Sequence, residues 1–154
     1  MKNLKIAIDP GHFGADLYTG KLEQKYVEFD FDDKTFQVVE GHLTMQVATI
    51  LKQLLLKQGA NVFLTRERQG ETSFGMTYGE WKRNQFLPSL DESYLHREVD
   101  EKMKEFLTSK ATEREIVRYY FNNLDLKNRA EKINVFKPDI TVIIHFNVDE
   151  KNKY

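Results

Sequence analysis

The chain has 154 residues, the usual length of one domain, and its composition of 40% hydrophobic and 31% charged residues is typical of a globular protein with a buried core. A formal net charge of −1 argues against long-range attraction to nucleic acid or to an anionic membrane. The absence of cysteine excludes disulfides and thiolate metal sites, and no apolar run approaches the about 20 residues that a membrane-spanning helix needs.

The first quarter of the chain predicts a strand, a loop and a hairpin. Residues 4–8 are a short apolar run ended by Asp-Pro-Gly, which is typical of a buried strand. Residues 11–20 read as a glycine-punctuated loop. Residues 25–40 alternate polar and apolar side chains on either side of an Asp-Asp-Lys turn, which predicts a β-hairpin.

An amphipathic helix is predicted over residues 41–58, and a second buried strand over residues 60–66. Gly59 stands where the C-terminal cap of the helix is expected. The apolar residues that recur at helical spacing, and that we expect to form one buried face, are Leu43, Val47, Ile50, Leu51, Leu54 and Leu55. A strand, a helix and a strand in this order favour a right-handed crossover in a parallel sheet.

The remainder of the chain predicts a helical insert and then a return to the sheet. Residues 69–125 are rich in charged and aromatic side chains, with helices expected over residues 94–107 and 112–124. A short helix over residues 126–136 and a strand over Ile140–Ile144 follow. We therefore expect one α/β domain, a mostly parallel twisted sheet flanked by helices, with an inserted hairpin and an inserted helical segment.

Two histidines follow strands that belong to the same predicted sheet. His12 comes just after the first strand and His145 directly after the last, so both imidazoles are expected at the edge where ligands gather in open α/β sheets. A catalytic zinc typically takes three protein ligands. Glu40 suits the third position because it opens the long helix, whose N-terminus favours a carboxylate. The alternatives are Glu23, which is closer to His12 in sequence, and Glu28, which lies inside the hairpin.

Four blocks of the sequence occur in an order typical of a known family. They are Asp-Pro-Gly-His at residues 9–12, the helix that begins at Glu40, G-x-x-V-x-L-T-R at residues 59–66, and a final series of Arg129, Asn134, Asp139, His145 and Asn147. With these blocks, residues 4–66 and 126–147 resemble the zinc-dependent N-acetylmuramoyl-L-alanine amidases of the type 3 class, which are cell-wall hydrolases.

The resemblance implies an activity, a metal and a location. The family hydrolyses the amide between the lactyl group of muramic acid and L-alanine in peptidoglycan, and the implied zinc ligands are His12, Glu40 and His145. It also implies a periplasmic or extracellular place in the cell envelope, although the sequence shows no signal peptide. We expect a monomer with peptidoglycan as its partner.

The sequence departs from the family pattern in the hairpin, in the 69–125 insert and at its end. The general-base glutamate of the family lies beyond a further strand, and no residue here matches it, so we expect a domain truncated at its C-terminus with the catalytic base unassigned. The first alternative is a non-catalytic zinc-binding relative that binds cell wall or regulates a partner. The second is an unrelated α/β binding domain with structural histidines.

Four further residues are candidates for supporting roles. Asp9 either orients a ligand imidazole or only forms the Asp-Pro-Gly turn. Arg66 and Arg129 either neutralise the site or a substrate carboxylate, or form structural ion pairs, which we favour. Asn147 belongs to the last block of the resemblance.

The insert leaves the second strand at its carboxyl end, so we expect it beside the metal edge of the sheet. A glutamate from it, Glu98 or Glu101, is a candidate for an inhibitory plug over the metal. Its aromatic residues either stack on sugar rings or, as we favour, dock the insert onto the body: Trp81, Phe86, Tyr94, Tyr119, Tyr120 and Phe121.

Overall fold

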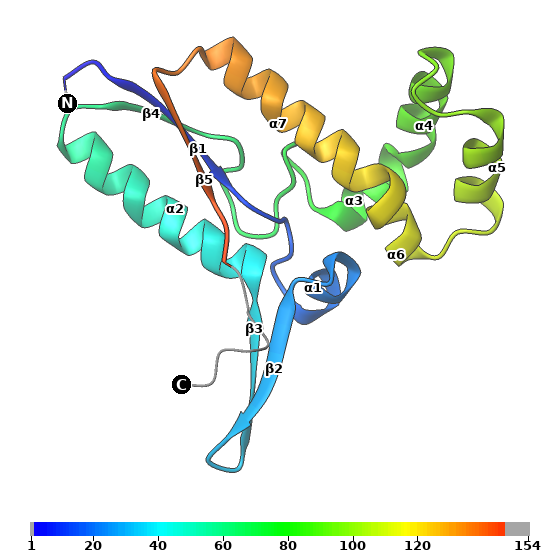
Figure 1. Cartoon of the computed structure of the whole chain (residues 1–154), viewed down its shortest axis with the longest axis horizontal. Coiled ribbons are helices and arrows are strands. Elements are labelled where there is room, and N and C mark those ends of the chain that lie inside the picture. The colour runs from blue at the N-terminus through cyan, green and yellow to red at the C-terminus, as the bar shows by residue number, and fades with distance from the viewer. Residues whose placement is uncertain (1, 147–154) are drawn as a thin grey trace.

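Three parallel strands in the order β4-β1-β5 form the central sheet (Figure 1). The computed structural model describes residues 2–146. The strand β1 (Lys5–Pro10) lies in the middle and pairs in parallel with β4 (Asn61–Leu64) and with β5 (Ile140–Ile144). The α/β fold with a parallel sheet is therefore as the sequence predicts, and the carboxyl ends of all three strands lie at one edge.

Helices cover both faces of this sheet. Ile6 and Ile8 of β1 pack against α2 (Glu40–Lys57), while Asp9, of opposite parity along the strand, pairs with an arginine of α7 (Asn122–Phe136). Figure 1 shows the two helices on opposite sides of the strands. Side chains alternate between the two faces of a strand, so the strand β1 is buried on both faces. Across residues 2–146, no helix combines the length and the hydropathy that a membrane span requires.

The buried face of α2 differs from the predicted one. Val47, Ile50 and Leu54 have exposed fractions of 41%, 58% and 55%. Leu51 and Leu55 are half-buried against the sheet. The buried residues of the helix are Glu40, Gly41, Thr44, Met45 and Ala48. The buried face contains small residues, which let the helix approach the sheet closely. Helical spacing alone does not decide whether this face or the one with Val47, Ile50 and Leu54 is buried.

The predicted hairpin is present and leads directly into α2. It consists of β2 (Tyr26–Phe31) and β3 (Lys34–Val39), and it extends away from the sheet (Figure 1). Asp32 and Asp33 both have positive φ angles, 52° and 57°, as the two-residue turn of a tight hairpin requires. Because β3 ends at Val39, the residue after it, Glu40, is the first of the helix.

A short helix, α1 (Leu17–Glu23), lies where the sequence predicts a loop. Asp16 is its N-cap: the side chain of Asp16 accepts a hydrogen bond from the backbone amide of Thr19, and the Thr19 hydroxyl interacts with the backbone of Asp16 in return. Such a reciprocal capping box satisfies backbone donors at a helix start. The loop prediction was wrong because it was based on Gly11, Gly14 and Gly20, which are typical of loops, and did not take the capping pair into account.

The insert is mainly helical, as predicted, although its helix boundaries differ. It comprises α3 (Tyr78–Asn84), α4 (Phe86–Leu95), α5 (Glu101–Ser109), α6 (Glu113–Ile116) and a π-helical turn, η1 (Val117–Phe121).

Two of the insert's boundaries show why the prediction failed. The helix predicted over residues 94–107 is interrupted, because Asp100 caps the start of α5. At the other end, α6, η1 and α7 follow one another directly, so the two helices predicted over residues 112–136 are one helical run. A helix that begins at a polar cap, such as Asp100 after the turn at residues 96–100, and helices joined through a π-turn both have apolar patterns that do not mark the junction.

The corrected face of α2 makes a testable prediction about stability. Met45→Ala should lower the free energy of unfolding by about 2–5 kcal/mol, because it removes a buried side chain beneath the helix. Val47→Ala, on the same helix, should change the free energy of unfolding by about 0.5 kcal/mol or less. Urea denaturation followed by circular dichroism measures both. A larger loss for Val47→Ala than for Met45→Ala would contradict the observed orientation.

Candidate metal site

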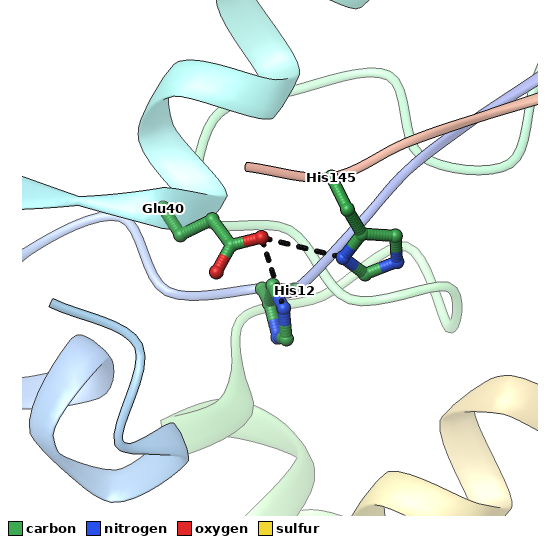
Figure 2. Close-up of side chains that lie close together, drawn as sticks. All are labelled: His12, Glu40 and His145. Carbon is green, nitrogen blue, oxygen red and sulfur yellow. Dashed lines mark hydrogen bonds and ion pairs between the residues drawn. The ribbon is translucent and has the colours of Figure 1, made fainter. Parts of the chain in front are cut away.

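Two imidazoles and one carboxylate meet at the carboxyl edge of the sheet (Figure 2). The Oε1 atom of Glu40 lies 3.3 Å from His12 Nε2 and 3.3 Å from His145 Nδ1. One ligand atom from each residue lies within 4.8 Å of the other two. The rings are nearly perpendicular, with an interplanar angle of 83°. This group can hold a metal ion, and its donors are of the kind that bind divalent metals without thiolates.

The Nε2 atom of His12 lacks a hydrogen-bond partner although it is buried. Unpartnered buried polar atoms are uncommon in folded proteins and need an explanation. The other ring nitrogen, Nδ1, lies 3.2 Å from Oε1 of Glu23, whereas Nε2 lies 3.3 Å from Oε1 of Glu40 without the geometry of a hydrogen bond. A metal ion facing Nε2, Glu40 and His145 would give this nitrogen a partner, so the three side chains could hold a metal ion.

Glu40 is fixed at the start of α2 by contacts on several sides. Its backbone amide donates to the carbonyl of Lys25, at 3.0 Å, and its carboxylate accepts from the backbone amide of Phe146, at 2.9 Å. The ammonium of Lys25 lies 3.8 Å from the second carboxylate oxygen. One turn further on, the Thr44 hydroxyl donates to the carbonyl of Gly11, at 2.6 Å, and ties the helix to the loop that carries His12.

Two glycines allow the backbones of the site to approach closely. A Cβ atom on Gly11 would lie 2.4 Å from Cε1 of His145 and 2.7 Å from the carbonyl oxygen of Ile144. A Cβ atom on Gly41 would lie 2.4 Å from the carbonyl oxygen of Gly14. Any side chain at either position would therefore push His145 or the start of α2 away from His12.

Asp9 belongs to a buried ion-pair network beneath the site. Its carboxylate accepts a hydrogen bond from the Thr65 hydroxyl and lies 3.3 Å from Nη1 of Arg129. Arg129 also pairs with Asp125, at 2.6 Å, and donates to the carbonyl of Pro10, at 3.0 Å. In the described part of the chain no imidazole contacts Asp9, and Glu23 occupies the place beside His12 that an orienting carboxylate would take.

Arg66 also binds the backbone that precedes His12. Its guanidinium donates to the carbonyls of Pro10 and Gly11, at 2.9 and 3.1 Å, and to that of Glu71. Burial and the neighbouring Arg129 lower the pKa of Arg66 to about 10. Arg66 and Arg129 are 2% and 4% exposed, so both guanidiniums support the loop before His12 and are shielded from a substrate carboxylate.

Glu23 is the site residue whose role the sequence did not predict. It was considered as a metal ligand, but its carboxylate contacts the far nitrogen of His12. The signal that could have found it is the capping pair of Asp16 and Thr19, because a helix that begins there brings its last residue back to the loop of His12.

The remaining candidates within residues 2–146 make contacts away from the three clustered side chains. Glu28 bonds to Gln37 on the hairpin, and Asn147 lies outside the described residues. Glu98 pairs with Lys127, and Glu101 is exposed on the first turn of α5. The prediction that a glutamate of the insert plugs the metal position is therefore wrong in this structure.

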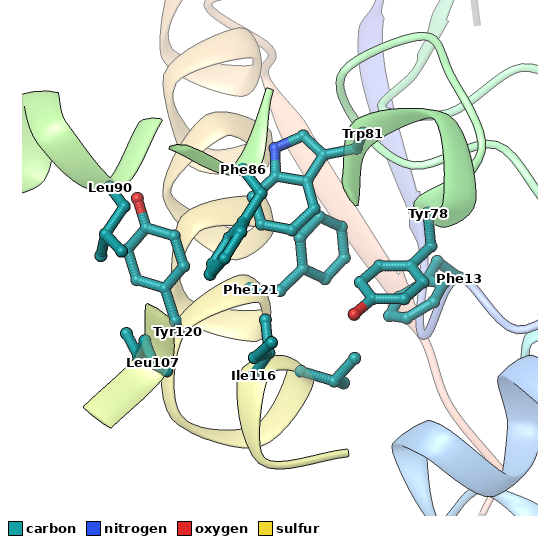
Figure 3. Packing of buried hydrophobic residues seen from close by; sticks show 10 residues of the cluster. Phe13, Tyr78, Trp81, Phe86, Leu90, Leu107, Ile116, Tyr120 and Phe121 are labelled. Carbon is teal, nitrogen blue, oxygen red and sulfur yellow. The ribbon is translucent and has the colours of Figure 1, made fainter. Parts of the chain in front are cut away.

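The insert packs against the loop of the metal site through an aromatic core (Figure 3). Phe13, the residue after His12, stacks on Tyr78 at 5.5 Å between ring centroids and meets the edge of Phe121 at 5.0 Å. The other buried members of this core are Trp81, Phe86, Leu90, Leu107, Ile116, Val117 and Tyr120. Most of the aromatic residues considered for sugar stacking thus dock the insert, although Tyr94 and Tyr119 are exposed.

Comparisons with protein-family models, with curated proteins and with solved structures found no match to this chain.

The ion-pair network beneath the site should be essential for stability. Arg129→Met should lower the free energy of unfolding by about 3–5 kcal/mol, because it leaves the buried carboxylates of Asp9 and Asp125 without their cation. The matched control is Arg68→Met, whose side chain is 83% exposed and whose loss should change the free energy of unfolding by less than about 0.5 kcal/mol. Chemical denaturation measures both. A loss below about 1 kcal/mol for Arg129→Met would show that the pairs are dispensable.

Proposed function

We propose that the chain is a zinc-dependent amidase domain that hydrolyses the bond between N-acetylmuramic acid and L-alanine in peptidoglycan. The observation that carries the proposal is the meeting of His12, Glu40 and His145, with the buried Nε2 of His12 facing the other two donors and lacking any hydrogen-bond partner. The order of the four motif blocks supports the same conclusion, because the three residues are those that the amidase resemblance implies.

The choice of zinc follows from the donors and their number. Two neutral imidazoles and one carboxylate are a common protein ligand set for catalytic zinc and leave one position for water or substrate. When bound, zinc supplies a Lewis acid that polarises a carbonyl and lowers the pKa of bound water toward about 7. In this chain His12 Nε2, His145 Nδ1 and Oε1 of Glu40 would hold the ion.

The burial of the three side chains indicates how a substrate reaches the site. The side chains of His12 and Glu40 are 17% and 10% exposed, whereas that of His145 is 48% exposed. Among residues 2–146, the site is therefore walled by α2 and the His12 loop and open on the side of His145. An opening at the surface suits a polymeric substrate, whose scissile amide cannot enter a closed cavity.

A second candidate function is zinc binding without catalysis, as in a relative that binds cell wall or regulates a partner. One observation favours it. In the described residues, the carboxylates that contact the two histidines are Glu40 and Glu23, and Glu23 already accepts hydrogen bonds from His12 and from two backbone amides. Neither carboxylate is free to act as a general base.

Zinc binding can be tested by removing each imidazole. His12→Ala and His145→Ala should each abolish stoichiometric zinc uptake, because three protein ligands become two. The fold should persist, since these side chains lie at the sheet edge and not among the core residues. Equilibrium dialysis with zinc and far-ultraviolet circular dichroism measure the two effects. The exposed His96→Ala serves as the control and should bind zinc as the unchanged protein does.

Activity on purified peptidoglycan separates the two candidate functions. The amidase proposal predicts release of new L-alanine amino termini, lost with a chelator and restored by added zinc. A protein that binds zinc stoichiometrically yet releases no amino termini supports the non-catalytic relative. A protein that does not bind zinc contradicts both.

A further inference from the structure

We propose that Glu23 is a positioning residue that fixes the tautomer and the ring orientation of His12, so that the unprotonated Nε2 faces Glu40 and His145. The proposal deepens the metal site described above and depends on it. The juxtaposition that supports it is a buried carboxylate on one nitrogen of the ring and an unpartnered nitrogen on the other.

The carboxylate of Glu23 lies in a cradle of donors from the His12 loop. Its side chain is 4% exposed. Oε2 accepts from the backbone amides of Phe13, at 3.1 Å, and Gly14, at 2.6 Å, while Oε1 lies 3.2 Å from Nδ1 of His12. Within residues 2–146 the ion-pair contact of Glu23 is with His12 and with no lysine or arginine. The buried charge is thus directed at the imidazole and its loop.

These contacts determine which nitrogen of the neutral ring carries the proton. An ionised carboxylate only accepts hydrogen bonds, so Nδ1 of His12, which has hydrogen-bond geometry toward Glu23, is the donor. The Nε2 atom lies 3.3 Å from the carboxylate of Glu40 but without the geometry of a hydrogen bond. In a neutral imidazole the other nitrogen is then an acceptor, and its lone pair can bind a metal. Carboxylates that bond to the far nitrogen of a metal-binding histidine orient the ring and raise its basicity.

The backbone of His12 explains why the ring needs this support. Its φ angle is +55°, a left-handed conformation that residues with a side chain rarely adopt. The two amides that follow His12 both bond to Glu23, so one carboxylate holds the unusual turn and the ring that it presents. α1 places Glu23 there, because Glu23 is its last residue and Gln24 ends the helix in a left-handed conformation.

Glu23→Gln changes the contact with the ring and keeps the two shortest contacts with the loop, although the Phe13 amide also lies 3.2 Å from Oε1. The side-chain oxygen of glutamine, at the place of Oε2, can still accept from the amides of Phe13 and Gly14. Its NH₂ group, at the place of Oε1, then faces Nδ1 and can only donate, which favours the wrong tautomer of His12. The matched control is Glu28→Gln, which makes the same change on the exposed hairpin.

The measurements are the zinc dissociation constant, from competition with a chelator, and the ¹⁵N spectrum of the histidine rings in the zinc-loaded protein. Glu23→Gln should weaken zinc binding by about 10–100-fold, with the circular dichroism and the unfolding midpoint of the metal-free protein unchanged, while Glu28→Gln should have no effect. In the unchanged protein, Nδ1 of His12 should carry a bonded proton.

Two results would overturn the proposal without affecting the metal site. One is equal zinc affinity for the unchanged protein and Glu23→Gln, and the other is an Nδ1 atom of His12 that carries no proton. A fall in zinc affinity matched by a fall in the unfolding midpoint of the metal-free protein would assign Glu23 to loop stability and also reject a positioning role. Failure of the unchanged protein to bind zinc would overturn the metal site and this role together.

Discussion

The geometry of the site depends on two buried arginines that hold the backbone at the end of β1. Arg66 and Arg129 donate to the carbonyl oxygens of Pro10 and Gly11, the residues that precede His12. These carbonyls belong to the last residue of β1 and to the residue after it, and a buried carbonyl without a donor is unfavourable. The carboxylates of Asp9 and Asp125 in turn compensate Arg129. The loop that presents His12 is therefore held by a satisfied charge network at Pro10 and Gly11 and by the aromatic packing of Phe13.

The parts of the fold that could be predicted from the sequence follow from periodicity and topology. Short apolar runs, such as those of β1 and β5, identify buried strands, and the parallel crossover places their carboxyl ends together. For that reason His12 and His145, far apart in sequence, could be expected at one edge. Glu40 could be chosen because it opens a helix, and the structure brings it to both imidazoles.

The parts that could not be predicted depend on contacts between elements. Val47 and Ile50 fit an apolar face as well as Met45 does, and only packing on the sheet decides which is buried. To predict the role of Glu23, one would first have to predict α1. This helix has too few apolar residues to give a periodic pattern, so its capping residues were the only signal. Tertiary contact thus decided the buried face of α2, whereas the place of Glu23 depended on a local capping signal together with the fold of α1.

The central claim is that His12, Glu40 and His145 bind one zinc ion together, and zinc K-edge X-ray absorption of the zinc-loaded protein tests it most directly. The account predicts back-scattering from two imidazole rings, with Zn–N distances of about 2.0–2.1 Å and carboxylate or water oxygen in the remaining positions. Both imidazole contributions should disappear from the spectrum if the two histidines are replaced. A spectrum of the unchanged protein with oxygen donors only, or with a single imidazole, would contradict the account.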